Sequence, residues 1–288
     1  MTFPPLLQPG DTVAVVALSG PCDPNRLASG VRVLESMGLR CRVTDSCRAR
    51  EGFLAGPDAL RLRDLHESFS SPEIRGVICA RGGYGAQRLL PYIDYALIKN
   101  NPKVFAGYSD VTALHIVFNQ LCKLVTFHAP MPASDFGGGD IHPETLRSFR
   151  ETLFAGKTRE ILPTAYPYTV FVPGRAAGIL TGGNLSLVAS SLGTPYEIDT
   201  RRRILFLEET NEEPYKIDRM LLQLKYAGKL AAAAGIVLGD FSPQTVETLA
   251  QSVNDILLPL NVPTVVNLPC GHTSPTLTLT LGTEIVIG

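Results

Sequence analysis

The sequence predicts an α/β protein: an N-terminal parallel-sheet domain with helices on both faces, followed by a smaller mixed α/β domain. Two observations predict this class. Short apolar runs alternate with amphipathic stretches through the first third of the chain, which is typical of parallel βαβ units. The 288 residues are 45% hydrophobic and 18% charged, a composition that suits roughly two globular domains with substantial cores.

The first strand is predicted over residues 12–18, where a β-branched apolar run ends at Ser-Gly-Pro. A helix is predicted over residues 25–37, because apolar positions 27, 31, 34 and 37 recur at helical spacing before a glycine. Further strands are expected at 39–44, 76–80 and 104–106, with a helix over 58–69 and others starting at residues 86 and 111.

The regular pattern weakens after residue 130, and residues 163–174 are rich in Pro and Tyr without a helical period. We therefore place the domain boundary there, dividing the chain into an N-terminal domain of residues 1–165 and a C-terminal domain of residues 166–288. In the second domain we expect strands at 203–207, 235–238, 277–281 and 284–287, and a helix at 215–226.

Charge and composition exclude several classes of protein. The 26 basic and 27 acidic residues give a formal net charge of −1, so no general basic field favours nucleic acid or an anionic membrane. No apolar run is long enough for a transmembrane helix, and residues 1–11 do not resemble a secretory signal. The six cysteines form no CxxC pair and often lie in apolar runs, which favours reduced, buried thiols in a cytoplasmic protein.

Two unusual segments fall at predicted strand ends, where ligands of open parallel sheets bind. One is RGGYG at 81–85, in which Gly82, Gly83 and Gly85 allow backbone N–H groups to face an anion. A tight strand-to-helix turn explains these glycines equally well. The segment matches neither the dinucleotide-binding motif nor the Walker loop.

The second segment is GYSD at 107–110, which places Ser109 between a strand and a helix. The helix N-terminus and the N–H of Asp110 are suited to stabilise an oxyanion beside this serine. Taken alone, however, a Ser or Asp before a helix favours an N-cap. The segment also departs from the GxSxG elbow, because Val111 replaces the final glycine.

A serine nucleophile needs a base and a group that orients the base. Among five histidines, His272 lies on a loop before the terminal strands and is a candidate base. Glu208 and Glu209 follow the strand predicted at 203–207 and are candidate acceptors, although acids at strand ends are often only solvated. The histidines lack the spacing of a metal site, so neither a metal nor a cofactor is expected.

Together these segments resemble the LD-carboxypeptidase family of serine peptidases, which includes the murein tetrapeptide carboxypeptidases. The resemblance covers essentially the whole chain, and its specificity comes from the joint order of the motifs. They are PGD at 9–11, SGP at 19–21, RGGYG at 81–85, GYSDVT at 107–112, GGNL at 182–185, LEE at 207–209, PYKIDR at 214–219 and GH at 271–272.

The resemblance implies a Ser-Glu-His triad divided between the two domains. Ser109 would be the nucleophile, His272 the general base and Glu208 the acceptor that orients His272. The backbone N–H groups of Gly83 and Asp110 would form the oxyanion hole. The resemblance also implies a homodimer.

Glu208 is preferred to Glu209 because the family acid directly follows the apolar strand residues. Alternation along a strand would point the two acids in opposite directions. The chain departs from the family pattern in having Glu209 where Asp is common and a longer stretch after His272. These departures affect the expected geometry of the loops and not the expected triad.

The implied reaction is hydrolysis of the amide between the L-centre of meso-diaminopimelate and the terminal D-Ala of a cytosolic murein tetrapeptide. One alternative is a microcin C immunity-type peptidase that cleaves aminoacyl-sulfamoyl nucleotides. The chain is short and has no long insertion to hold a nucleobase, which favours the tetrapeptide. Another alternative is an inactive ligand-binding protein on the same scaffold, which the presence of all three triad residues disfavours.

Overall fold

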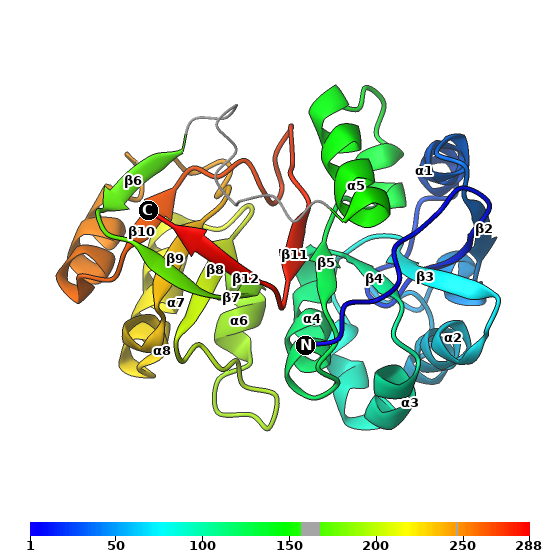
Figure 1. Ribbon diagram of the computed structural model, residues 1–288, viewed down its shortest axis with the longest axis horizontal. Coiled ribbons are helices and arrows are strands. Elements are labelled where there is room, and N and C mark those ends of the chain that lie inside the picture. The colour runs from blue at the N-terminus through cyan, green and yellow to red at the C-terminus, as the bar shows by residue number, and fades with distance from the viewer. Residues whose placement is uncertain (157–167, 246) are drawn as a thin grey trace.

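The computed structural model describes residues 1–156, 168–245 and 247–288. They form two six-stranded sheets, each with a parallel centre and helices around it, and the two units lie side by side (Figure 1). The predicted fold class is confirmed. The boundary expected near residue 165 lies outside the described residues, so the division at that residue stays a prediction.

The first sheet carries the motifs of the N-terminal half. Its strands are, in spatial order, β11 (Leu279–Leu281), β5 (Thr126–His128), β4 (Val104–Gly107), β3 (Ile74–Cys79), β1 (Thr12–Val16) and β2 (Arg40–Val43). The helices around it are α1 (Pro24–Ser36), α2 (Asp58–Ser70), α3 (Tyr95–Asn100), α4 (Thr112–Gln120) and α5 (Pro143–Ala155), with the 3₁₀ helices η1 (Asp45–Arg48), η2 (Ala86–Tyr92) and η3 (Ser109–Val111) and the π-helical turn η4 (Pro132–Phe136). Only β11 runs antiparallel to its neighbour in this sheet.

Both faces of the first sheet are buried. Ala14 and Val16 of β1 pack with apolar residues of α2, α3 and α4, whereas Val13 and Val15 pack with those of α1 and α5. Burying a Val, Leu or Phe side chain contributes about 1.5–3 kcal/mol. The apolar runs predicted from sequence therefore become central strands covered by helices on both sides, and only their ends remain available for a site.

The second sheet has the same plan with antiparallel edges. Its strands are, in spatial order, β12 (Glu284–Ile287), β7 (Ala176–Asn184), β8 (Arg203–Glu208), β9 (Gly235–Leu238), β10 (Thr264–Val266) and β6 (Thr169–Val172). The helices are α6 (Leu185–Ser190), α7 (Pro214–Tyr226), α8 (Lys229–Ala232) and α9 (Ala250–Ser252), followed by the π-helical turn η5 (Val253–Leu257) and the 3₁₀ helix η6 (Leu258–Leu260). Strands β7 to β10 are parallel, and β6 and β12 are antiparallel to them.

The last strands of the chain join the two sheets. Strand β11 pairs with β5 of the first sheet, and β12 pairs with β7 of the second. Leu279 and Leu281 of β11 also lie in the core formed with Phe206 and Val237 of the second sheet. This shared core holds the two sheets in a defined arrangement, which matters because the site draws residues from both.

Most predicted elements are present, with ends that differ by at most two residues. The helix expected from residue 86 is wrong in type: the segment is the 3₁₀ helix η2, and Pro91 within it has no N–H to continue an α-helix. In the described part of the chain, no helix is both long and apolar enough to span a bilayer.

Candidate active site

Ser109 lies at the carboxyl end of β4, at the first position of the turn η3. Its backbone φ is 64°, in the left-handed region that residues other than glycine rarely adopt. Such a conformation costs of order 1–3 kcal/mol, and it is maintained here by the fully buried strand β4 and by the helix that follows. Neither η3 nor α4 has a side-chain N-cap, so the N-cap interpretation favoured by the residues alone is wrong.

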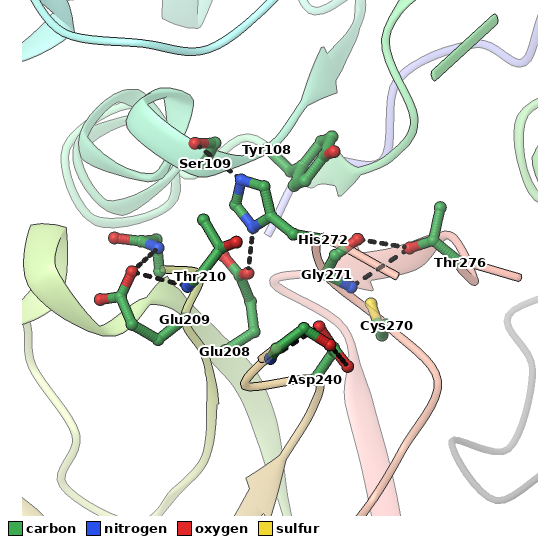
Figure 2. A network of polar contacts seen from close by, with 12 residues as sticks. Tyr108, Ser109, Glu208, Glu209, Thr210, Asp240, Cys270, Gly271, His272 and Thr276 are labelled. Atoms are coloured by element: carbon green, nitrogen blue, oxygen red, sulfur yellow. Dashed lines mark hydrogen bonds and ion pairs between the residues drawn. The ribbon is translucent and has the colours of Figure 1, made fainter. Parts of the chain in front are cut away.

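The structure brings Ser109, His272 and Glu208 together, although they are far apart in the sequence. Ser109 Oγ lies 3.2 Å from His272 Nε2, and His272 Nδ1 lies 2.7 Å from Glu208 Oε2 (Figure 2). The two nitrogens of one imidazole therefore face a hydroxyl and a carboxylate. With Nδ1–H donating to Glu208, Nε2 is free to accept the proton of the serine hydroxyl.

The loop that carries His272 is held by Thr276. The hydroxyl of Thr276 accepts from the backbone N–H of Gly271 at 3.1 Å and donates to the carbonyl oxygen of the same residue at 2.9 Å (Figure 2). The carbonyl oxygen of Cys270 accepts from the backbone N–H of Asp240 at 2.9 Å, which ties the loop to the end of β9. His272 is thus presented from a fixed loop between β10 and β11.

The two adjacent glutamates point in different directions, as strand alternation predicts. Glu208 is completely buried and faces His272. Glu209 instead accepts hydrogen bonds from Asn184 Nδ2, from the N–H and hydroxyl of Ser186, and from the N–H of Thr210. Four donors to one carboxylate explain how a second acid can be buried beside the first.

Burial and pairing shift the pKa values of the imidazole and the carboxyl. Complete burial raises the pKa of Glu208, while the hydrogen bond to His272 lowers it, and the net direction is upward. Burial lowers the pKa of His272, but the hydrogen bond and charge of Glu208 oppose this and raise it overall above its ordinary value. A carboxylate in this position favours the protonated form of the His272 imidazole.

The glycine-rich loop approaches the serine directly. A methyl group built on Gly82 would lie 2.8 Å from Ser109 Cβ, 2.9 Å from Ser109 Oγ and 3.5 Å from the backbone nitrogen of Asp110. Only a residue without a side chain leaves room for the Ser109 side chain at this point. Gly83 is the next residue, so its N–H lies in the segment that borders the serine.

The carboxylate of Asp110 connects the serine turn to the same loop. It is buried and accepts from the backbone N–H of Ala86 at 2.8 Å. Arg61, also buried, donates to the carbonyl oxygen of Gly85 at 2.9 Å. The end of the loop is therefore held from two sides, and Asp110 combines a backbone N–H near the serine with a side chain that orders the facing segment.

The other four histidines have structural surroundings. His115 and His128 are buried, His66 Nε2 accepts from a backbone N–H, and His142 caps α5. His66 lies in α2 and His115 in α4. Of the histidines, His272 alone forms a hydrogen bond with Ser109 in the described part of the chain.

Sequence reasoning missed two residues that border the imidazole. The ring of Tyr108 lies 4.8 Å from that of His272, measured between centroids, and the Tyr108 hydroxyl donates to Asp135 at 2.9 Å. Asp135 also accepts from the backbone N–H of Met131, which fixes its position. Tyr108 directly precedes Ser109 in the GYSD segment, and this adjacency was the one signal in the sequence that it lies at the site. Asp135 carried none, because the turn η4 that places it beside Tyr108 was not predicted from the sequence.

Comparison with known sequences now decides the family. The family model described as the LD-carboxypeptidase N-terminal domain matches residues 13–129, and the model of the C-terminal domain matches residues 177–287. The chain belongs to the LD-carboxypeptidase family. The resemblance inferred from the motifs is therefore confirmed over both halves of the chain.

Individual members of the LD-carboxypeptidase family match over nearly their full length. A probable murein peptide carboxypeptidase of Bacillus subtilis is 44% identical, over 98% of this chain and 90% of the relative. A murein tetrapeptide carboxypeptidase of Pseudomonas aeruginosa is 30% identical, over 90% of this chain and 87% of the relative.

Solved structures of LD-carboxypeptidase relatives share the fold. An MccF-like protein from Bacillus anthracis superposes with a TM-score of 0.92 and 28% identity, covering 100% of this chain and 96% of the other. A muramoyltetrapeptide carboxypeptidase from Oxalobacter formigenes superposes with a TM-score of 0.82 and 32% identity, covering 95% and 93%. The two-sheet architecture is thus common to a relative named MccF-like and to a relative named muramoyltetrapeptide carboxypeptidase.

Proposed function

We propose that this protein is a serine LD-carboxypeptidase that removes the terminal D-Ala from murein tetrapeptide by hydrolysing its amide bond to the L-centre of meso-diaminopimelate. One observation supports the proposal most. In this member of the LD-carboxypeptidase family, hydrogen bonds connect the Ser109 hydroxyl to the His272 imidazole and that imidazole to the buried Glu208 carboxylate. The names of the relatives from Bacillus subtilis and Pseudomonas aeruginosa supply the substrate class.

In the proposed mechanism Ser109 is the nucleophile and His272 is the general base. As the serine oxygen attacks the scissile carbonyl carbon, its proton passes to His272 Nε2, and Glu208 stabilises the resulting imidazolium. The backbone N–H groups of Gly83 and Asp110 donate to the oxyanion of the tetrahedral intermediate.

Collapse of the intermediate releases the product amine. His272 donates its proton to the nitrogen of the departing D-Ala, which leaves an ester between Ser109 and the L-centre carbonyl. Water then attacks this ester with His272 again as base, and the free tripeptide carboxylate leaves. Removing one donor from an oxyanion hole typically costs about 10²–10³ in kcat, so both N–H groups are substantial contributors in this scheme.

The test is release of free D-Ala from purified murein tetrapeptide, measured for the native protein and two serine variants. Ser109→Ala should abolish turnover, whereas Ser70→Ala should retain it, since the Ser70 hydroxyl is exposed and donates only to a neighbouring carbonyl oxygen. Turnover by Ser109→Ala would reject the nucleophile. Absence of D-Ala release by the native protein would reject the substrate and favour the inactive ligand-binding alternative.

A second candidate activity is cleavage of an aminoacyl-sulfamoyl nucleotide. A likeness to the protein MccF favours it: a structure of MccF in complex with glutamyl sulfamoyl guanosine, 25% identical to this chain, superposes with a TM-score of 0.86 over 99% of it. Offering aminoacyl-sulfamoyl adenosine beside the tetrapeptide in one assay separates the two reactions. If kcat/KM is higher for the nucleotide conjugate, the conjugate and not the tetrapeptide is the substrate.

We infer in addition that the protein acts in the cytoplasm as a homodimer. All six cysteines are free thiols, and five of them are buried, which suits a reducing compartment. The homodimer follows from the family resemblance. Sedimentation equilibrium of the native protein tests it, and a monomer mass at micromolar concentration would reject it.

A further inference from the structure

A side chain at the start of α4, directly after the turn that carries the serine, bonds the second sheet. Thr112, the first residue of α4, is completely buried, and its Oγ1 accepts a hydrogen bond of 3.0 Å from the backbone N–H of Asn184 at the end of β7. The N–H of Thr112 in turn donates to the carbonyl oxygen of Ser109. The nucleophile is therefore one helical turn away from a contact between the two sheets.

The end of β7 is shaped to receive this hydroxyl. Gly183 has a φ of 140°, and a methyl group built on it would lie 2.4 Å from Thr112 Oγ1 and 2.8 Å from Thr112 Cγ2. Any other residue at this position would collide with the threonine and adopt a strained backbone. The close approach lets the N–H of Asn184 reach the hydroxyl.

The contact continues toward the residues that hold His272. Asn184 Nδ2 donates to Glu209 Oε1 at 2.9 Å, and the backbones of Asn184 and Glu208 are paired in the ladder between β7 and β8. Glu208 bonds His272, which faces Ser109. These hydrogen bonds, together with the peptide bond between Glu208 and Glu209, form a closed ring from the serine turn, through the second sheet, to the imidazole and back.

We propose that the Thr112 hydroxyl is a positioning group that holds Ser109 within reach of His272. The serine belongs to the first sheet, while the glutamate belongs to the second, so their spacing depends on contacts between the two units. The ring accounts for residues of three motifs that the triad alone leaves without a role: the threonine of GYSDVT, Gly183 and Asn184 of GGNL, and the second acid of LEE. Testing this inference by D-Ala release rests on the proposed function, whereas testing it by the distance from Ser109 Oγ to His272 Nε2 does not.

The experiment compares Thr112→Val, which removes the acceptor while keeping the shape, with Thr112→Ser, which keeps the acceptor. Crystal structures give the distance from Ser109 Oγ to His272 Nε2, and D-Ala release gives kcat and KM. In Thr112→Val the distance should exceed the hydrogen-bond limit of about 3.5 Å. Its kcat should fall about 100-fold, as expected when a reacting group is displaced by about 1 Å, while KM stays within about threefold. Thr112→Ser should match the native protein in both.

Ser148→Ala is the matched control, because Ser148 Oγ is also buried and accepts a long-range backbone N–H, that of Thr278, at 2.9 Å. It should lower stability without changing kcat or the serine–histidine distance.

An unchanged distance or an unchanged kcat in Thr112→Val would overturn the proposal, and so would equal losses in Thr112→Ser. If the valine variant does not fold, Thr112→Ala takes its place with the same expectations. If the native protein does not release D-Ala, the proposed function fails, and the distances alone decide the role of Thr112.

Discussion

Replacing Glu208 by Gln tests the electrostatic part of the site without changing its shape. The carboxylate is completely buried and lies 2.7 Å from His272 Nδ1, so it faces the imidazole rather than solvent. Glutamine keeps an oxygen that accepts the Nδ1–H but removes the negative charge. We expect the variant to fold and bind substrate, and to be slow in the step that creates the imidazolium.

The expected loss follows from the geometry. Two unit charges about 4 Å apart interact by about 4 kcal/mol at the effective dielectric constant of about 20 that suits protein sites. Because each 1.36 kcal/mol corresponds to about a factor of ten in rate, kcat should fall about 10³-fold. The pH profile should change as well. Burial lowers the pKa of His272 and Glu208 raises it, so removing the charge should move the acidic limb of kcat/KM to lower pH.

The assay is D-Ala release from murein tetrapeptide between about pH 5 and pH 9, a range that spans the ordinary histidine pKa, with thermal unfolding as a check on folding. Asp240→Asn is the control, since this carboxylate lies near Glu208 but accepts from Ser242 rather than from His272 (Figure 2). It should keep kcat/KM within about threefold. The reasoning is refuted if Glu208→Gln loses less than about tenfold, which is 1.4 kcal/mol, or if its acidic limb stays where it was.

Three further changes have defined outcomes. Gly82→Ala should lower kcat by about 100-fold or more, because its methyl group would lie 2.9 Å from Ser109 Oγ; full D-Ala release would show that the loop can move away. Asp110→Ala should lower the free energy of unfolding by about 1–3 kcal/mol, because the buried N–H of Ala86 loses its acceptor, and urea denaturation measures this directly. Burial lowers the pKa of His115 to about 4, so the unfolded chain takes up a proton before the folded protein does as the pH falls. The free energy of unfolding should therefore drop by up to about 3 kcal/mol between about pH 7 and pH 4, and His115→Gln should remove that part of the slope.

Local patterns in the sequence identified the elements and the chemically distinctive residues. The run at 12–18 became β1, and the apolar spacing at 25–37 became α1, because burial on a sheet or along one helix face repeats every few residues. The same locality explains the failures. Taken alone, Ser109 favoured an N-cap because it precedes a helix, whereas its hydroxyl faces His272, a residue from the far end of the chain.

The sequence by itself determined the fold class, the family and the positions of Ser109, Glu208 and His272 within their motifs. Only the tertiary structure decided that these side chains meet, since Ser109 and His272 are 163 positions apart and Glu208 and His272 are 64 apart. It also decided that β11 adds to the first sheet although it comes from the end of the chain. The physical reason is that residue periodicity reports only which face of an element is buried. Which buried faces meet depends on packing between segments that share no local pattern.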